Sequence, residues 1–155
     1  MQVTFRVNHQ TVTWETTLSQ TLADGLRAHG FTSVKCGCSQ GTCGMCTVWL
    51  DGKPVLSCSV LLCRLDGHEV TTVEGIEDQA RELAAYLVAE GGDQCGFCAP
   101  GYIMTVLAME RELSPPVTEE AAAAYLAGNL CRCTGYRSKL RAAVQYLSRE
   151  RSAPA

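Results

Sequence analysis

The sequence predicts an α+β protein with a small β-sheet in its first half and helices in its second half. Three observations support this. Apolar residues alternate with polar ones early in the chain, they recur at helical spacing from about residue 78 onward, and eight of the ten cysteines form two groups that divide along the same line. We therefore expect two domains, residues 1–76 and 77–155.

Alternating apolar residues predict two strands at the start of the chain, separated by a turn at residues 8–10. The alternating positions are Val3, Phe5 and Val7 before the turn and Val12 and Trp14 after it. A third strand is expected at 47–50, which is rich in β-branched and bulky residues. Asp51-Gly52 is a strong hairpin signal leading into residues 53–55, and 70–73 is the last strand candidate.

One short helix is expected to cross this sheet, over residues 21–29. Ser19 is the candidate N-cap of this helix, and Gly30 is its stop signal. A long loop rich in glycine and cysteine follows at residues 36–46.

Helical periodicity in four stretches predicts four helices in the second half. The recurring apolar positions are Leu83, Tyr86 and Leu87; Ile103, Val106 and Leu107; Ala122, Tyr125 and Leu126; and Leu140, Val144 and Leu147. Pro100 suits the first turn of the second helix. Thr118 can cap the third helix, and Gly128 is expected to close it.

Charge and hydropathy exclude several classes of function. The net charge is −3, and the basic residues are scattered apart from a modest cluster at 132–141, so we expect no nucleic-acid binding. No apolar stretch approaches the roughly 20 residues that span a bilayer, and residues 1–7 lack the pattern of a signal peptide. We therefore expect a cytoplasmic protein with no membrane span, in which clustered cysteines bind metal or carry out redox chemistry.

The first cysteine group has the spacing C-x4-C-x2-C-x11-C. Its members are Cys38, Cys43, Cys46 and Cys58. One tight loop delivers three thiolates, and the predicted hairpin returns the fourth. Gly37, Gly41 and Gly44 allow backbone N–H groups to approach cluster sulfurs without a Cβ in the way. This order is the plant-type ferredoxin pattern for a [2Fe–2S] cluster.

Two other kinds of metal site fit this first group less well. Zinc sites more often use paired C-x2–4-C knuckles than a triple with interleaved glycines. A Rieske centre needs two histidine ligands, whereas His9, His29 and His68 all lie outside the cysteine boxes. We expect these histidines to be exposed or locally hydrogen-bonded.

The second group pairs a C-x2-C motif with a C-x-C motif 32 residues later. Its members are Cys95, Cys98, Cys131 and Cys133. A lone C-x-x-C before a helix is typical of thiol–disulfide oxidoreductases, but those have a βαβ context and no use for a second pair. Two helix-end pairs can face each other and close a four-thiolate site, which we interpret as a second [2Fe–2S] cluster. A zinc-stabilised interaction module and a thiol–disulfide oxidoreductase are the alternatives.

At this point the sequence resembles a known family, the iron–sulfur small subunits of molybdenum hydroxylases (xanthine dehydrogenases and aldehyde oxidoreductases). The matching segments are Ser33-Val34-Lys35-Cys36-Gly37-Cys38, Gly44-Met45-Cys46-Thr47-Val48, Val70-Thr71-Thr72-Val73-Glu74-Gly75-Ile76, Gln94-Cys95-Gly96-Phe97-Cys98-Ala99-Pro100-Gly101 and Gly128-Asn129-Leu130-Cys131-Arg132-Cys133-Thr134-Gly135-Tyr136. They cover nearly the whole chain in the family's order, and the last two are highly specific.

The resemblance implies a plant-ferredoxin-like β-grasp domain followed by an all-α four-helix domain, each holding one [2Fe–2S] cluster. It also implies a large partner subunit that binds a molybdopterin cofactor and a medium subunit that binds FAD. Gln94 and Cys133 match positions that approach the pterin. Electrons from the molybdenum site would enter at the second cysteine group and leave from the first, and this chain would supply no catalytic residue. Arg132 and Arg137 are candidates for stabilising the reduced cluster or contacting a partner.

Two cysteines stand outside both groups. The family usually has an aromatic or other bulky residue at the position of Cys36, and Cys63 is likewise outside the ligand pattern. We expect both to be buried free thiols, with Cys36 able to replace a neighbouring ligand in a mutant. Because the chain ends soon after the helical domain, we expect a stand-alone subunit, and overall likeness favours a substrate such as xanthine, another purine or an N-heterocycle.

Overall fold

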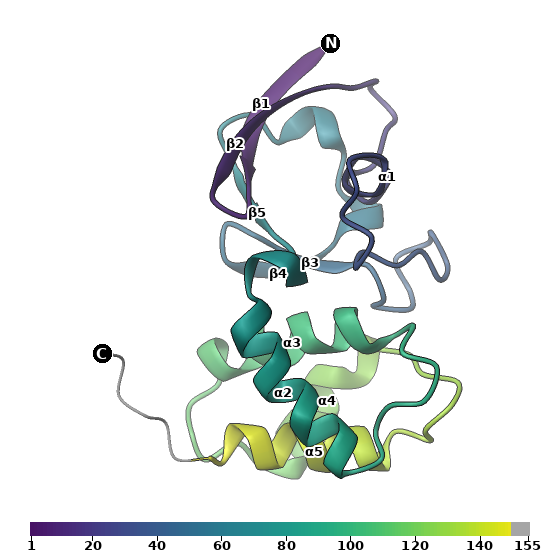
Figure 1. The fold of residues 1–155 in the computed structure, drawn as a ribbon, viewed down its shortest axis with the longest axis vertical. Helices are drawn as coiled ribbons and strands as arrows, with labels where there is room; N and C mark the ends of the chain where they lie inside the picture. Colours follow the sequence, from purple (N-terminus) through teal and green to yellow (C-terminus); the bar gives the residue numbers. More distant parts are fainter. Residues whose placement is uncertain (150–155) are drawn as a thin grey trace.

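The computed structural model describes residues 1–149 and places a β-sheet domain against a helical domain (Figure 1). Five strands form one sheet in the order β2-β1-β5-β3-β4. Their bounds are β1 Gln2–Val7, β2 Gln10–Glu15, β3 Thr47–Leu50, β4 Lys53–Leu56 and β5 Glu69–Thr71. Strand β5 is central and runs parallel to β1, and the other neighbouring pairs are antiparallel. With one helix across the sheet, this is the predicted β-grasp arrangement.

The crossing helix, α1 (Leu22–Ala28), begins one residue later than predicted and has a different cap. The hydroxyl of Thr21 accepts a hydrogen bond from the backbone N–H of Asp24 at 3.1 Å. The prediction of Ser19 as the N-cap was therefore wrong. A capping side chain must directly precede the first helical residue to reach the free N–H groups of the first turn, and Ser19 lies too early in the chain.

The second half forms the four predicted helices, α2 Glu77–Ala89, α3 Ala99–Glu112, α4 Glu119–Tyr125 and α5 Arg137–Leu147. Pro100 lies in the first turn of α3, and the hydroxyl of Thr118 accepts from the N–H of Ala121 at 3.2 Å, as expected. Gly128 does not close α4 directly. A 3₁₀ turn over Leu126–Gly128 follows the α-helix, so the glycine ends that tighter turn instead. Further 3₁₀ turns occupy Ser57–Ser59, Leu62–Arg64 and Val73–Gly75.

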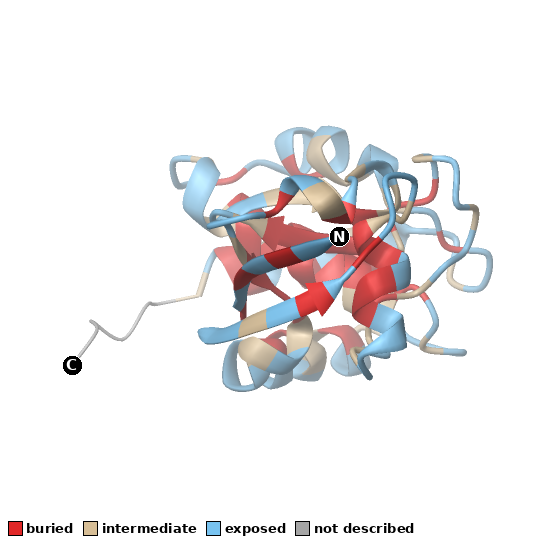
Figure 2. Cartoon of the chain, turned by 90° about the horizontal axis from the view of Figure 1, so that it is seen from above, coloured by how far each residue is buried: buried red, intermediate tan, exposed pale blue. Residues whose placement is uncertain are grey.

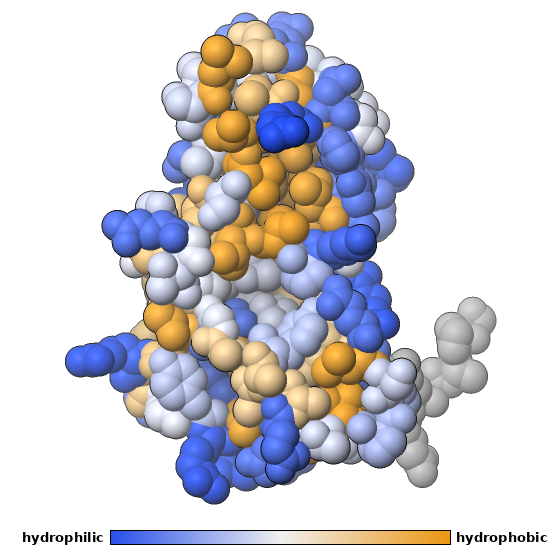
Figure 3. Space-filling view, turned by 180° about the vertical axis from the view of Figure 1, so that it is seen from behind, coloured by the Kyte–Doolittle hydropathy of each residue, from blue (hydrophilic) through white to orange (hydrophobic). Residues whose placement is uncertain are grey.

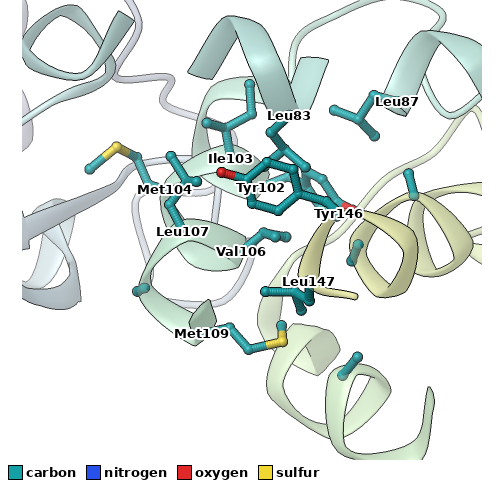
Figure 4. Packing of buried hydrophobic residues seen from close by; sticks show 14 of the residues in the cluster. Leu83, Leu87, Tyr102, Ile103, Met104, Val106, Leu107, Met109, Tyr146 and Leu147 are labelled. Carbon is teal, nitrogen blue, oxygen red and sulfur yellow. The ribbon is translucent and has the colours of Figure 1, made fainter. Parts of the chain in front are cut away.

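Each domain has its own hydrophobic core. In the sheet domain, alternate residues of β1 point inward, so that Val3, Phe5 and Val7 are buried (Figure 2). In the helical domain, Tyr102 of α3 and Tyr146 of α5 lie among leucines and other apolar side chains of the neighbouring helices (Figure 4). Burial of these side chains supplies most of the driving force for folding.

The two domains are joined mainly through α3, which lies against β3 and the cysteine-rich loop before it. Trp49 belongs to the helical core, and its indole N–H donates to the carbonyl of Met104 at 2.9 Å. The Arg111 guanidinium stacks 3.7 Å above the Trp49 ring and donates to the carbonyl of Gly52 at 3.0 Å. The domains are therefore held in a defined relation by packing and by specific hydrogen bonds.

The surface carries hydrophobic side chains unevenly. On the face opposite that of Figure 1, apolar residues gather over the sheet domain above its junction with the helices (Figure 3). Across residues 1–149, the helices are all too short or too polar to cross a membrane.

Gly101 allows the closest approach between the domains. A Cβ added there would lie 2.3 Å from the carbonyl oxygen of Gly44 and 2.9 Å from Cα of Met45, both of them backbone atoms. We expect Gly101→Ala to lower the free energy of unfolding by about 1–3 kcal/mol, because overpacking forces the backbone apart. Chemical denaturation of the parent chain and the variant, loaded with the same amount of metal, measures this difference in the free energy of unfolding.

The matched control is Gly128→Ala. A Cβ at Gly128 meets no heavy atom within 4 Å, so this change should leave stability within about 0.5 kcal/mol of the parent chain. Equal unfolding midpoints for the two variants would contradict the tight junction at Gly101.

Candidate metal centres

The first cysteine group occupies the loop between α1 and β3, with its fourth member after β4. The start of this loop is anchored by Ser33, whose backbone N–H and hydroxyl donate to the Glu74 carboxylate at 3.1 and 2.6 Å. Burial raises the pKa of Glu74, but the hydroxyls of Ser33 and Thr72 outweigh it, and the pKa is lowered overall. These hydrogen bonds therefore fix the start of the cysteine loop to the sheet domain.

The β3–β4 hairpin brings Cys58 back beside Cys46. Thr47 pairs with Leu56 in the ladder, so the chain returns after eleven intervening residues to the place it left. The hydroxyl of Ser57 then donates to the carbonyl of Cys46 at 2.7 Å. Burial raises the pKa of the Cys46 thiol to about 11, and the neighbouring Cys58 thiol adds to this rise.

The other two thiols of this group, Cys38 and Cys43, also lie together. The backbone N–H groups of Gln40 and Thr42 both donate to the Cys38 sulfur at 3.4 Å. These donors lower the pKa of Cys38 to about 7, with a further contribution from the thiol of Cys43. Burial raises the pKa of Cys43 itself. The N–H groups of the loop thus stabilise the thiolate form of Cys38.

The second group is assembled from two loops at the ends of helices. Cys95 and Cys98 immediately precede α3, while Cys131 and Cys133 lie between α4 and α5. The sulfurs of Cys95 and Cys133 are 3.5 Å apart. In Figure 1 these loops and the cysteine loop of the sheet domain all lie on the same side of the molecule, to the right.

Local hydrogen bonds and charges act on this second group as well. The Cys131 sulfur lies 3.2 Å from the hydroxyl of Thr134. Burial raises the pKa of Cys131, but the Thr134 hydroxyl and nearby backbone N–H groups outweigh it and lower the pKa to about 7. Burial raises the pKa of Cys98, partly opposed by the charge of Lys139. The thiol of Cys95 raises the pKa of Cys133.

The eight thiols thus form four pairs, two in each group. The pairs are Cys38 with Cys43, Cys46 with Cys58, Cys95 with Cys133, and Cys98 with Cys131. All ten cysteines are free of disulfides. Within the part of the chain that the structure describes, no three histidine, cysteine or acidic side chains converge as they would around one ion. Two pairs per group are what a site for two metal ions requires.

The two groups are in direct contact through the backbone. The N–H of Leu130, next to Cys131, donates to the carbonyl of Cys43 at 2.9 Å. Cys43, Cys98 and Cys131 line one narrow cleft between the domains. One hydrogen bond and a few covalent bonds therefore link a thiol of the first group to a thiol of the second.

Sequence reasoning missed Lys139, which lines the same cleft. Its side chain is buried, with 4% of the residue exposed, and its Nζ lies 4.6 Å from the centre of the Tyr102 ring. A signal was present in the sequence. Lys139 stands three, four and seven residues before Ala142, Ala143 and Tyr146, which places it on the buried face of α5.

The remaining predicted residues are near the second group or outside both groups. Gln94, Arg132 and Cys133 are exposed on the loops of the second group, and Arg137 is exposed at the start of α5. The prediction that Cys36 and Cys63 are buried was wrong. Cys36 is exposed in an irregular loop, and Cys63 is half-buried in the 3₁₀ turn Leu62–Arg64, so both lie in short connecting segments at the surface.

The three histidines are locally bonded, as expected. His29 stacks on Trp14 with ring centroids 3.8 Å apart, and His68 lies 2.6 Å from the carboxylate of Asp51. His9 pairs with Glu69 at 2.8 Å. None of the three lies with the cysteines.

Comparison with known proteins assigns a family to each domain. Residues 5–69 match the family described as 2Fe-2S iron-sulfur cluster binding domain, and residues 72–145 match the [2Fe-2S] binding domain. The nicotinate dehydrogenase small FeS subunit of Eubacterium barkeri is 43% identical over 119 residues, covering 76% of this chain and 74% of that protein. A probable xanthine dehydrogenase subunit from Bacillus subtilis (strain 168) is 38% identical over 143 residues, covering 90% of this chain and 82% of that protein.

Among solved structures, quinoline 2-oxidoreductase from Pseudomonas putida 86 is similar in fold as well as sequence. Its matching chain superposes with a TM-score of 0.87 at 33% identity, covering 95% of this chain and 93% of that one.

Gly44 holds the contact between the two cysteine groups. Its φ is +71°, and an added Cβ would lie 2.5 Å from the carbonyl oxygen of Gly128. We expect Gly44→Ala to lower the iron and sulfide bound per chain, because it separates the segment of Cys43 and Cys46 from that of Cys131. Metal and acid-labile sulfide analysis measures this.

Gly52→Ala provides the control, since Gly52 has a similar φ of +79° but open space around it. It imposes comparable backbone strain without the clash. If both variants bound as much iron as the parent chain, the contact at Gly44 would not matter for assembly.

Proposed function

This chain belongs to the family of iron–sulfur small subunits of molybdenum hydroxylases, which includes xanthine dehydrogenases and aldehyde oxidoreductases, and we propose that its four thiol pairs hold two [2Fe–2S] clusters. Members of this family transfer electrons within an oxidoreductase complex. The observation that carries the assignment of ligands is the pairing of the eight thiols, together with the backbone hydrogen bond that links the two groups.

The donor set fits such clusters in number and spacing. A [2Fe–2S] cluster takes four thiolates, two on each iron. Two thiolates on one tetrahedral metal at about 2.3 Å lie about 3.8 Å apart, and the sulfurs of Cys95 and Cys133 are separated by 3.5 Å. Cys38 with Cys43 and Cys46 with Cys58 would bind the two irons of the first cluster. Each cluster, when bound, accepts and releases one electron at a time.

The residues of this chain position, insulate and tune the clusters and supply no acid, base or nucleophile to the substrate. Backbone N–H groups at Cys38 and the hydroxyl at Cys131 stabilise negative charge on sulfur. Burial of Cys43, Cys46, Cys98 and Cys131 keeps water from the facing sides of the two groups.

The exposed surface of the loops around the second group has the features of a partner surface. Phe97, Leu130 and Tyr136 are 44%, 39% and 47% exposed on the loops that carry its cysteines, and exposed apolar side chains gathered in this way favour a protein contact. We propose that the large molybdopterin-binding subunit docks here, with Gln94 and Cys133 toward the pterin. Electrons would then enter at the second group and leave from the first, to FAD on a medium subunit.

The substrate belongs to the partner, and we propose a purine or another N-heterocycle. The support is that nicotinate, xanthine and quinoline appear in the names of similar proteins that span most of this chain. A cytoplasmic location is proposed because ten cysteines without a disulfide are typical of a reducing compartment.

The assignment predicts a metal content and its distribution. The parent chain should contain about four iron and four sulfide per chain. Cys46→Ser and Cys98→Ser should each retain about half of this, since each removes a buried ligand from a different group. Metal analysis, with electron paramagnetic resonance after dithionite reduction, checks both. Zinc in place of iron, or the same resonance lost in both variants, would rule out the two-cluster assignment.

Exposed Cys36 provides a separate test of the ligand set. No thiol is paired with it, so Cys36→Ser should keep the full iron content. Cys38→Ser should keep part of the iron of the first cluster. Cys36 lies two residues away in the same exposed loop and can supply a thiolate in place of Cys38. The double variant, Cys36→Ser with Cys38→Ser, should lose this remaining iron. Equal iron content in the single Cys38→Ser and double variants would show that Cys36 cannot substitute.

A further inference from the structure

Lys139 is a buried cation without a protein counter-ion. Only 4% of the residue is exposed, and within residues 1–149 Nζ has no oxygen or nitrogen hydrogen-bond partner, so that the Cys98 thiol is the side chain it acts on. The ion pairs found in that part of the chain do not include it. Removing an ammonium group from water is costly unless a nearby charge or dipole offsets the loss.

The fold holds this side chain firmly in place. The backbone carbonyl of Lys139 accepts a hydrogen bond from the hydroxyl of Tyr102 at 2.6 Å, and its Nζ lies over the ring of the same tyrosine at 4.6 Å. A ring face attracts a cation, but this attraction alone is modest. The ammonium group is therefore placed by α3 and α5 together, and its neutralising charge has to come from elsewhere.

The other groups in the cleft indicate where that charge comes from. Lys139 lines the cleft with Cys43, Cys98 and Cys131. Its charge favours the thiolate of Cys98, against the effect of burial. Two ferric ions, two sulfides and four thiolates leave an oxidised cluster with two negative charges, and one added electron makes a third.

We propose that Lys139 is the counter-charge of the cluster held by Cys95, Cys98, Cys131 and Cys133, and that it raises the reduction potential of this cluster. The proposal rests on the ligand assignment above. The ammonium group attracts the cluster in both oxidation states, but it attracts the reduced state more strongly because that state has one more negative charge. Lys139, Cys98 and Cys131 lie on the buried side of the site, where this difference is larger than it would be in water.

The position of the lysine gives the proposal a consequence for electron flow. Lys139 lies in the cleft that the second group shares with Cys43 of the first. A higher potential at the second cluster favours uptake of each electron from the partner. Although Cys43 lines the same cleft, the charge of Lys139 acts on the Cys98 thiol and is not among the influences on Cys43, while backbone N–H groups donate to the Cys38 sulfur of the first group.

The test is a potentiometric titration of the full chain with both clusters loaded, followed by electron paramagnetic resonance. Lys139→Met replaces the ammonium group with an apolar side chain of similar length. We expect the equilibrium constant for reduction of the second cluster to fall about tenfold or more, which corresponds to about 59 mV for one electron. The first cluster should shift much less. Cys46→Ser and Cys98→Ser identify which resonance belongs to which cluster.

Three further variants separate charge from packing. Lys139→Arg keeps the charge and should restore most of the potential, whereas neutral Lys139→Gln should behave like Lys139→Met and serves in its place if that variant loses a cluster. Lys53→Met makes the same chemical change at an exposed site in β4 and should leave both potentials unchanged.

An unchanged potential of the second cluster in both neutral variants, with iron and sulfide at parental levels, would overturn the proposal. So would an equal shift of both clusters. Failure of the parent chain to bind a second cluster at all would instead overturn the ligand assignment, so the two failures are distinguishable.

Discussion

The structure depends on one close contact, in which the cysteine loop of the sheet domain rests directly on the helical domain. At this contact Gly101 of α3 lies against the backbone of Gly44 and Met45, and Leu130 donates to the carbonyl of Cys43. The two segments that carry the thiol groups therefore meet backbone to backbone at this point, and the Asn129 side chain adds a hydrogen bond to the carbonyl of Gly44 at 3.4 Å. A larger residue at either glycine would separate the groups, and electron transfer between them would suffer first because it depends steeply on separation. The chain therefore uses its glycines where the two carriers have to be adjacent.

Much of the fold and of the thiol grouping could be predicted from the sequence, because the relevant signals are local. Alternation of Val3, Phe5 and Val7 fixes a strand and its buried face, and Asp51-Gly52 fixes the hairpin that returns Cys58 to Cys46. The C-x4-C-x2-C loop is similarly local. The grouping of Cys95 and Cys98 with a pair 32 residues later follows only from elimination and from the family resemblance, because no short-range pattern encodes that two helix ends meet.

What the sequence did not reveal depends on three-dimensional surroundings. Ser19 and Thr21 are equally good caps by residue type, and only the position of the first helical turn distinguishes them. Cys36 is as apolar as a core residue, yet it is exposed because the loop there has nothing packed over it. Which thiols pair within each group is likewise a property of the folded chain. In each case the residue type was compatible with two environments, and tertiary packing decided between them.

Lys139 shows how a polar residue at a core position can be informative. Helical spacing puts it on the buried face of α5, where an aliphatic side chain would fill the space without a desolvation cost. A lysine at such a position destabilises the polypeptide considered alone. The cost is offset only if a negative charge resides nearby in the working protein, and the adjacent thiol group is where such a charge would be. The negative charge of the proposed cluster thus explains why a lysine is tolerated at this buried position. The folding of α5 is thereby linked to the redox chemistry of the site.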